Sequence, residues 1–184
     1  MRDLITLLEA KAKAEHIEIV PLAFKNTQFA PVLSTEAMNL HLKLAHGYTE
    51  RYNKDEGDSE FNYAGYFLHN LLFPQYREPR TNNVPNGPIG GFIKTKFKSY
   101  ENFVDQLATE AMKLQGSNWI YLARDGSIKS IHNHEVRDDI LLIIDMWEHA
   151  FILDYGSDKK KYLDNIWRVI NWNVINARWG EAYK

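Results

Sequence analysis

Residues 139–150 read DILLIIDMWEHA, an apolar run that ends in an acidic residue, with a histidine four positions further on. A short, continuous apolar run of this kind predicts a strand that is buried on both faces. Asp145 and His149 then stand where the strand ends. This stretch therefore predicts a sheet in the second half of the chain and places two possible metal ligands at the end of one of its strands.

Two further strands are predicted just before this stretch. Residues 119–123 and 128–132 are rich in β-forming residues and flank an Asp-Gly dipeptide at 125–126, which is typical of a hairpin turn. Upstream, helical spacing of apolar residues predicts a helix over residues 99–115 with a serine at its N-cap. Helices are expected again over residues 159–184.

The first half of the chain is predicted to be helical. Ser34 is a suitable N-cap for a long helix that runs to about Asn53, and a second helix spans residues 60–73. The polar, acidic segment between them predicts a loop that joins antiparallel helices. A short amphipathic helix is expected over residues 2–14, followed by an irregular stretch, 17–33, that contains two prolines.

The segment 74–91 carries four prolines and three glycines and is the predicted boundary between the two halves. The expected fold class is α+β: an N-terminal antiparallel helical hairpin, then a small three-stranded antiparallel sheet with flanking helices. The expected domains are an N-terminal extension (1–18), a helical-hairpin domain (19–84) and an α/β domain (85–184).

Composition excludes several classes of protein. The chain has 184 residues, 22 basic and 24 acidic, and a net charge of -2, which argues against a general nucleic-acid surface. It has no cysteine, so disulfides, zinc ribbons and thiol nucleophiles are excluded, and any metal must be held by histidine and carboxylate. No apolar stretch approaches the roughly 18 residues that a membrane helix needs, and no signal peptide is visible. We therefore expect a cytoplasmic protein.

Four of the possible metal ligands are placed so that they can meet. A lone histidine is more often structural than a ligand, but His41 and His69 lie within the two helices of the predicted hairpin. If the helices pair, both imidazoles can face one point, with Asp145 and His149 at the end of the buried strand. Three imidazoles and one carboxylate suit a first-row metal such as iron or manganese. The metal site would lie between the two domains.

The sequence around these residues resembles the iron/manganese superoxide dismutases. Residues 145–150 (DMWEHA) are similar to that family's DxWEHAY signature, and residues 162–172 keep its Y-x4-W-x3-NW spacing. The resemblance covers roughly residues 19–178, with the motifs in the family's order. The other matching segments are 34–41 (STEAMNLH), 62–69 (NYAGYFLH), 85–87 (PNG) and 116–122 (GSNWIYL).

The resemblance implies a function and a ligand set. The family converts superoxide into oxygen and hydrogen peroxide, and the implied ligands are His41, His69, Asp145 and His149, with a solvent molecule completing the site. The implied cofactor is one iron ion per chain, with manganese as the alternative. Two other interpretations stay open: a dismutase-like structural or metal-binding protein without turnover, and an unrelated metal hydrolase.

The resemblance also concerns residues around the ligands. In the family a glutamine hydrogen-bonds the metal-bound solvent from one of two positions, which here hold Gly65 and His134. We expect His134 to replace that glutamine, which favours iron; the alternative is that His134 is a solvated hairpin residue. Trp119 and Trp147 occupy the family's active-site tryptophan positions, and Phe73 stands where another tryptophan is usual. These three rings are equally consistent with plain core packing.

One tyrosine of the family passes protons at the entrance to the site. Without a gap its position falls on Thr49, but one deletion after His41 aligns it with Tyr48, which we prefer. Tyr48 lies seven residues after His41 and so faces the same side of the helix.

The resemblance implies a homodimer. The family's glutamate that reaches across the dimer to the other subunit's ligand histidine corresponds to Glu148, and the tyrosine of the dimer bridge is replaced by Ile152. Glu148 is alternatively a solvated carboxylate. Because superoxide is an anion and the net charge is negative, local positive charge has to steer the substrate. The candidates are Lys43 and the run Lys159, Lys160 and Lys161, although that run is more typical of a solvated helix start.

Overall fold

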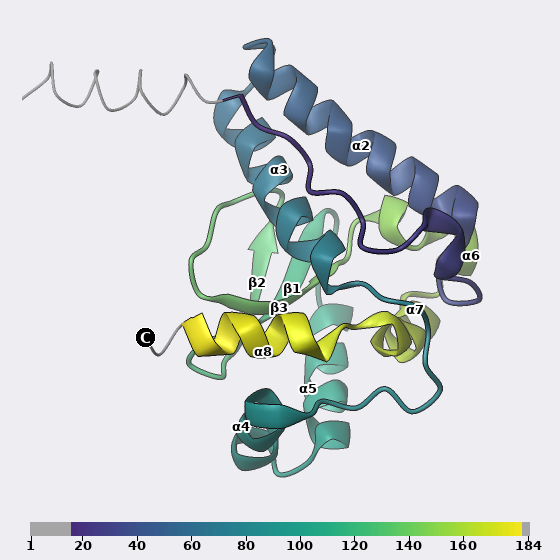
Figure 1. Cartoon of the computed structure of the whole chain (residues 1–184), viewed down its shortest axis with the longest axis vertical. Coiled ribbons are helices and arrows are strands. Elements are labelled where there is room, and N and C mark those ends of the chain that lie inside the picture. Colours follow the sequence, from purple (N-terminus) through teal and green to yellow (C-terminus); the bar gives the residue numbers. More distant parts are fainter. Residues whose placement is uncertain (1–15, 182–184) are drawn as a thin grey trace, which may run out of the picture.

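The structure, a computed structural model, describes residues 16–181, and its first two described α-helices form an antiparallel pair (Figure 1). Helix α2 spans Thr35–Asn53 and helix α3 spans Ser59–Leu72. Ser34 caps α2 by accepting a hydrogen bond from the amide of Ala37, and an aspartate caps α3 in the same way. The predicted helical hairpin is therefore confirmed, with its first N-cap at the predicted residue.

An extended segment crosses the hairpin before α2 begins. The side chain of Asn53 bonds both the amide and the carbonyl of Ile17, at 3.0 and 2.9 Å, and Asn70 accepts from the amide of Val20 at 2.7 Å. A short 3-10 helix, η1 (Asn26–Gln28), follows. The helix expected over residues 2–14 lies outside the described residues. This segment is thus attached to both helices of the hairpin.

Three antiparallel strands form the sheet, in the order β2-β1-β3. They are β1 (Asn118–Ala123), β2 (Ile128–His132) and β3 (Ile140–Asp145). Every residue of β1 and of β3 is buried, as the continuous apolar run of β3 predicts. The fold is therefore the expected α+β arrangement, and it brings Asp145 to the end of a fully buried strand.

Helices surround the sheet, and two of them, α4 and the four-residue α6, were not predicted. Helix α4 begins at Gly87, inside the proline- and glycine-rich segment that we expected to be a loop. Pro88 stands in its first turn, where a proline costs no hydrogen bond. In Figure 1 the α2–α3 hairpin lies at one end of the molecule and α4 at the other. The bounds of the remaining helices are α4 (Gly87–Phe97), α5 (Tyr100–Met112), α6 (Ile152–Tyr155), α7 (Lys159–Ile166), α8 (Trp172–Glu181), η2 (Phe73–Gln75), η3 (Glu148–Ala150) and η4 (Trp167–Val169).

A buried side chain joins the hairpin to the outer side of β3. Gln75 is fully buried just after α3; its amide nitrogen donates to the carbonyl of Ile143, and its oxygen accepts from the amide of Ile143 at 3.3 Å. Arg178 of α8 donates to the same oxygen at 3.1 Å and to the carbonyl of Leu141 at 3.0 Å. These bonds fix β3 two residues before Asp145.

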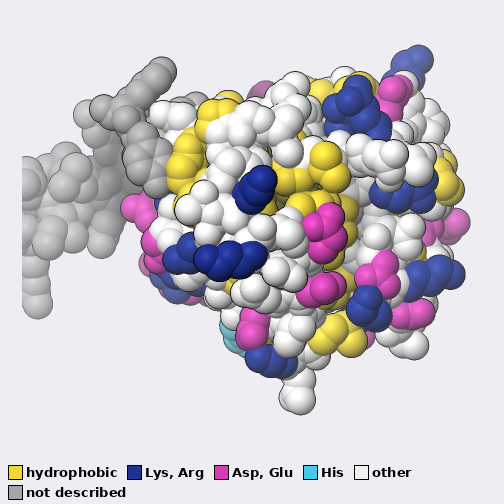
Figure 2. All heavy atoms as spheres, turned by 90° about the horizontal axis from the view of Figure 1, so that it is seen from below, with side chains coloured by type: hydrophobic (Ala, Val, Ile, Leu, Met, Phe, Trp, Pro, Cys, Tyr) yellow, Lys and Arg dark blue, Asp and Glu magenta, His cyan; other side chains and the backbone are white. Residues whose placement is uncertain are grey.

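The surface carries both signs of charge. On the face beneath α4, shown in Figure 2, lysine and arginine side chains are interspersed with acidic ones. That face therefore presents no continuous basic surface. Among the described helices, none combines the length and the apolar character that crossing a membrane requires.

Candidate metal centre

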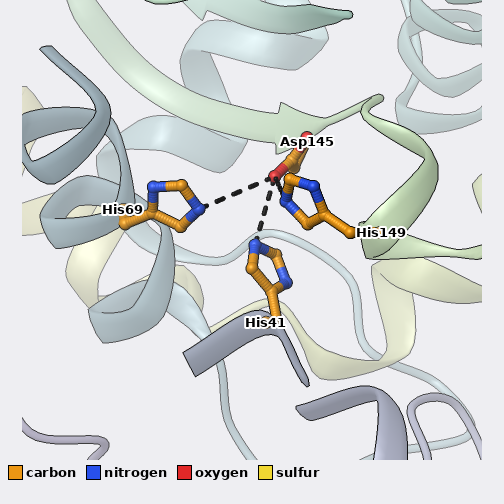
Figure 3. Close-up of side chains that lie close together, drawn as sticks. All are labelled: His41, His69, Asp145 and His149. Atoms are coloured by element: carbon orange, nitrogen blue, oxygen red, sulfur yellow. Dashed lines mark hydrogen bonds and ion pairs between the residues drawn. The ribbon is translucent and has the colours of Figure 1, made fainter. Parts of the chain in front are cut away.

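Four side chains from four elements meet between the helix pair and the sheet (Figure 3). His41 comes from the middle of α2 and His69 from the last turn of α3, while Asp145 is the last residue of β3 and His149 lies in η3. One ligand atom from each residue lies within 4.8 Å of all the others. The four residues that the sequence singled out are thus brought together.

The carboxylate lies at the centre of the group. Its Oδ2 is 3.1 Å from Nε2 of His41, 3.1 Å from Nε2 of His149 and 4.0 Å from Nε2 of His69. His41, His69 and Asp145 are buried, and the side chain of His149 is 12% exposed. All three imidazoles therefore present the same nitrogen to one carboxylate oxygen.

Local hydrogen bonds set the orientation of two of these groups. Nδ1 of His69 lies 2.6 Å from the carbonyl of Gly65, one turn earlier in α3, so this nitrogen donates and Nε2 keeps its lone pair. Oδ1 of Asp145 accepts from the amide of Trp147 at 2.8 Å, which leaves Oδ2 for the cluster. Tyr162 donates to the carbonyl of Asp145 at 3.1 Å. The backbone thus aims both ligand atoms inward.

Burial and the charges within the cluster shift the pKa values of its members. Burial is the main cause for the two buried histidines. It lowers the pKa of His41, partly opposed by Asp145, and it lowers the pKa of His69 well below the ordinary value, with His41 adding to the effect. For Asp145, burial alone raises the pKa, but the interactions with His149 and His41 outweigh it and the pKa falls below its ordinary value. Neutral imidazoles beside an ionised carboxylate are the protonation states that metal binding requires.

The residues fit a mononuclear transition-metal site. Nε2 of His41 and Nε2 of His69 are buried and, apart from their approach to Oδ2 of Asp145, have no polar partner among the described residues, although buried polar atoms are nearly always paired. A metal ion at the point where the four ligand atoms converge would satisfy both nitrogens. Three imidazole nitrogens and one carboxylate oxygen are ligands that iron and manganese accept.

His134 packs beside this cluster rather than in solvent. Its ring stacks on Trp147, with centroids 4.7 Å apart, and lies 4.6 Å from the Tyr48 ring and 4.5 Å from the Phe61 ring. The residue is only 9% exposed, and burial lowers its pKa to about 4. Within the described chain, neither ring nitrogen has a hydrogen-bond partner. His134 is thus a buried, neutral imidazole that contacts residues of α2 and α3.

Tyr48 packs against both His134 and the cluster. Its ring centroid is 5.7 Å from that of His69, and the residue is 7% exposed. Burial, followed by the charge of Asp145, raises the pKa of Tyr48, so its hydroxyl keeps its proton at neutral pH. Thr49, the ungapped alternative, donates its hydroxyl to the carbonyl of Ala45 within the helix. Of these two residues, it is Tyr48 whose ring packs against the cluster.

Aromatic rings surround the four candidate ligands. Phe73 lies 5.2 Å from His41 and 5.6 Å from His69, and Trp119 meets His69 edge-on at 5.1 Å. Phe73 and Trp119 are fully buried, whereas Trp147 is half-buried and lies 5.7 Å from His149. Such a wall limits the rotamers of the histidines and the access of water.

The other candidate residues lie at the surface. Glu148 and Ile152 are exposed, the latter by 42%. Lys43 is exposed on α2. Lys160 pairs with Asp164, and the side chain of Lys159 lies over the Phe151 ring at 5.9 Å. Lys161 is exposed in the first turn of α7, and its backbone amide donates to the side chain of Asp158, which caps that helix.

Two residues near the cluster were missed by sequence reasoning. Phe61, in the first turn of α3, packs on His134, and Arg51 of α2 lies over the Tyr48 ring. The spacing offers one signal for Arg51: it stands three residues after Tyr48 and therefore on the same helix face. Phe61 resembles any apolar residue of a helix, so no sequence signal distinguishes it.

Comparisons with known proteins agree with this geometry. Residues 85–178 match the family model described as iron/manganese superoxide dismutases, C-terminal domain. An iron superoxide dismutase of Pyrobaculum aerophilum is 29% identical, covering 88% of this chain and 91% of the relative. A manganese/iron superoxide dismutase of Porphyromonas gingivalis is 31% identical over 88% of this chain and 98% of its own length. A mitochondrial manganese superoxide dismutase of Zea mays is 30% identical over 96% and 89%.

Proposed function

Because this chain belongs to the iron/manganese superoxide dismutase family, we propose that it converts superoxide into oxygen and hydrogen peroxide at the site described above. The proposed ligands are His41, His69, Asp145 and His149. The observation that carries the proposal is the convergence of their four ligand atoms within 4.8 Å, in a buried place where Nε2 of His41 and Nε2 of His69 approach no polar group other than Asp145. A bound iron or manganese ion supplies the one-electron redox chemistry.

The ligands themselves set the charge of the site. Burial keeps His41 and His69 neutral, whereas Asp145 is ionised. An ionised carboxylate beside these imidazoles offsets part of the charge of a trivalent ion while leaving the divalent state accessible. The amide of Trp147 and the carbonyl of Gly65 hold two of the ligands in this geometry.

The residues around the ligands have separate proposed roles. Phe73, Trp119 and Trp147 restrict solvent and fix the imidazole rings. Tyr48 keeps its hydroxyl proton at neutral pH and lies beside the site, which supports a role in proton delivery. His134 replaces the family's glutamine, with Gly65 leaving space for its ring.

We propose iron, one ion per chain, as the metal. The support is His134, because a histidine at this position goes with iron more than with manganese in the family. The relatives' names include iron, manganese and mixed enzymes, so the family itself accommodates both metals.

We also propose a homodimer and a two-domain division. The exposed pair Glu148 and Ile152 supports a dimer contact, because both lie within four residues of the ligand His149. The division into residues 1–18, 19–84 and 85–184 places two ligands in each of the larger parts. A cytoplasmic location stays a prediction of the sequence.

Metal analysis and a superoxide-decay assay on one purified sample test the function. We expect about one iron per chain and rapid decay. Stoichiometric manganese with rapid decay would keep the function and overturn the choice of metal. A metal-loaded protein without activity would favour the alternative, a dismutase-like metal-binding protein.

Replacing Asp145 with asparagine tests the ligand set. The variant keeps the shape of the side chain but loses its charge, so we expect metal affinity to fall more than the roughly 10- to 100-fold that loss of an outer hydrogen-bond partner costs. Asp139→Asn is the matched control, since Asp139 immediately precedes the same strand and pairs with Lys129 at 2.7 Å. Full metal content in Asp145→Asn would disprove the ligand assignment.

A further inference from the structure

The side chain of Arg51 is held next to Tyr48. The central carbon of its guanidinium lies 5.0 Å from the centroid of the Tyr48 ring, within the range of a cation–π contact. Its Nε donates a hydrogen bond to Oδ1 of Asn62 at 3.1 Å. The guanidinium is therefore fixed across the two helices of the hairpin, although the residue as a whole is exposed.

Asn62 and Gly47 favour this position of the guanidinium. Asn62 is buried, and its amide nitrogen donates to the carbonyl of Glu56 at 2.9 Å, so its oxygen is kept turned toward Arg51. One turn before Arg51 the helix has Gly47; a Cβ there would stand 3.2 Å from Nη1 of Arg51. The missing side chain at position 47 thus leaves room for the arginine to lie along α2.

No carboxylate of residues 16–181 neutralises the charge of Arg51. The loop that follows α2 is acidic, yet none of the described carboxylates lies within 4.0 Å of the guanidinium, and Glu50 pairs with Lys54 instead. The charge of Arg51 also affects the pKa values of two buried residues. Burial is the main cause of the raised pKa of Tyr48, and Arg51 opposes that rise; Arg51 also adds to the lowering of the pKa of His134.

We propose that Arg51 is a substrate-steering residue, whose fixed guanidinium attracts superoxide to the Tyr48 side of the site. This inference rests on the proposed function. A chain with a net charge of -2 needs local positive charge to draw in an anion. Arg51 meets that need because its guanidinium contacts the Tyr48 ring, which packs on His69 of the cluster. In the lysine run, Lys160 is paired with Asp164 and Lys159 lies over Phe151.

Binding of azide, a small monovalent anion, to the iron-loaded protein tests this role without turnover. We expect Arg51→Gln to bind azide about threefold more weakly at low ionic strength, and the difference to vanish at 1 M salt, where the Debye length is only about 3 Å. The kcat/KM for superoxide should fall by a similar factor and lose part of its salt dependence. Arg80→Gln removes an exposed arginine from the segment between η2 and α4 and is the charge-matched control. Its azide affinity should match that of the wild type.

Arg51→Lys distinguishes the effect of the positive charge from the effect of the hydrogen bond between Arg51 and Asn62. Lysine lacks the planar guanidinium that bonds Asn62 but keeps the positive charge. Because the charge attracts the anion, we expect the azide affinity of Arg51→Lys to be within about twofold of the wild type. The inference is wrong if Arg51→Gln binds azide like the wild type at low salt, if its deficit persists at 1 M salt, or if the lysine variant loses as much as the glutamine variant. Wild-type protein that binds azide with the expected Arg51 dependence but does not consume superoxide would overturn only the proposed function.

Discussion

Gly65 and His134 share one space: a Cβ at position 65 would stand 2.8 Å from Nδ1 of His134. The same atom would lie 2.8 Å from Cγ of Tyr48. Both neighbouring rings are buried and packed on other rings, so neither can move away cheaply. The absence of a side chain in the middle of α3 is thus a condition for the His134–Tyr48 contact.

Gly65→Ala is expected to destabilise the fold. Alanine normally favours a helix over glycine by about 1 kcal/mol, but here its methyl group would push two buried rings apart, and overpacking costs about 1–3 kcal/mol. We expect a net loss, measured as a lower midpoint of urea unfolding. Gly91→Ala in α4 is the control, because nothing lies within 4 Å of a Cβ there. A gain in stability at both positions would contradict the shared space.

His134→Gln is expected to change how stability depends on pH. Burial holds the pKa of His134 at about 4, whereas the unfolded residue titrates near 6.5. Between about pH 6.5 and pH 4, the His134 imidazole is therefore protonated in the unfolded state but not in the folded state. The free energy of unfolding falls over this range as the pH drops, by up to about 3 kcal/mol.

The glutamine variant should lack this part of the acid loss while keeping its metal. Urea unfolding of both metal-loaded proteins at pH 7.5 and pH 4.5 measures the difference. His132→Gln changes the exposed histidine of the same hairpin and should behave like the wild type. An identical pH dependence in all three proteins would show that His134 is not a buried neutral group.

Tyr48→Phe is expected to slow turnover without loss of metal. The ring packing against His69 and His134 survives, but the hydroxyl that carries a proton at neutral pH is removed. We expect kcat at saturating superoxide to fall roughly 100-fold, the lower end of the range for proton-transfer groups. Tyr66→Phe, which removes a hydroxyl on α3, should leave kcat unchanged. Undiminished turnover in Tyr48→Phe would assign proton delivery to another group.

Ile152→Asp tests the proposed homodimer. Ile152 and Leu153 are exposed by 42% and 47%, and a charge placed in an apolar contact would have to lose its water. We expect the variant to sediment as a monomer where the wild type sediments as a dimer. Val136→Asp, with a similar exposure of 43%, is the control and should stay dimeric. A monomeric wild type would refute the proposal directly.

Much of this fold could be predicted from local patterns. The strand of residues 140–145 was visible as a continuous apolar run, and the N-caps Ser34 and Ser99 marked two helix starts. The four candidate ligands could be paired because the two helices and the strand end were each predictable. Helix α4 was missed because Gly87, Pro88 and two further glycines outweigh its weak apolar pattern, although Pro88 suits a first turn.

What could not be predicted depends on contacts between elements. Phe61 touches His134 only because the loop that follows β2 lies against the first turn of α3. Asn133, which precedes His134, adopts a positive φ of 55°, a conformation that no pattern around it announces. The role of Arg51 likewise depends on Asn62, which another helix supplies.

The bonds between Gln75 and Ile143 bear on aggregation. β3 is an outer strand, and its backbone groups would otherwise be open to pairing with a strand of another molecule. The Gln75 amide occupies the donor and the acceptor of Ile143 on that side, as a neighbouring strand would. The same side chain that fixes the strand carrying Asp145 thus closes part of the sheet edge against growth into a larger, intermolecular sheet.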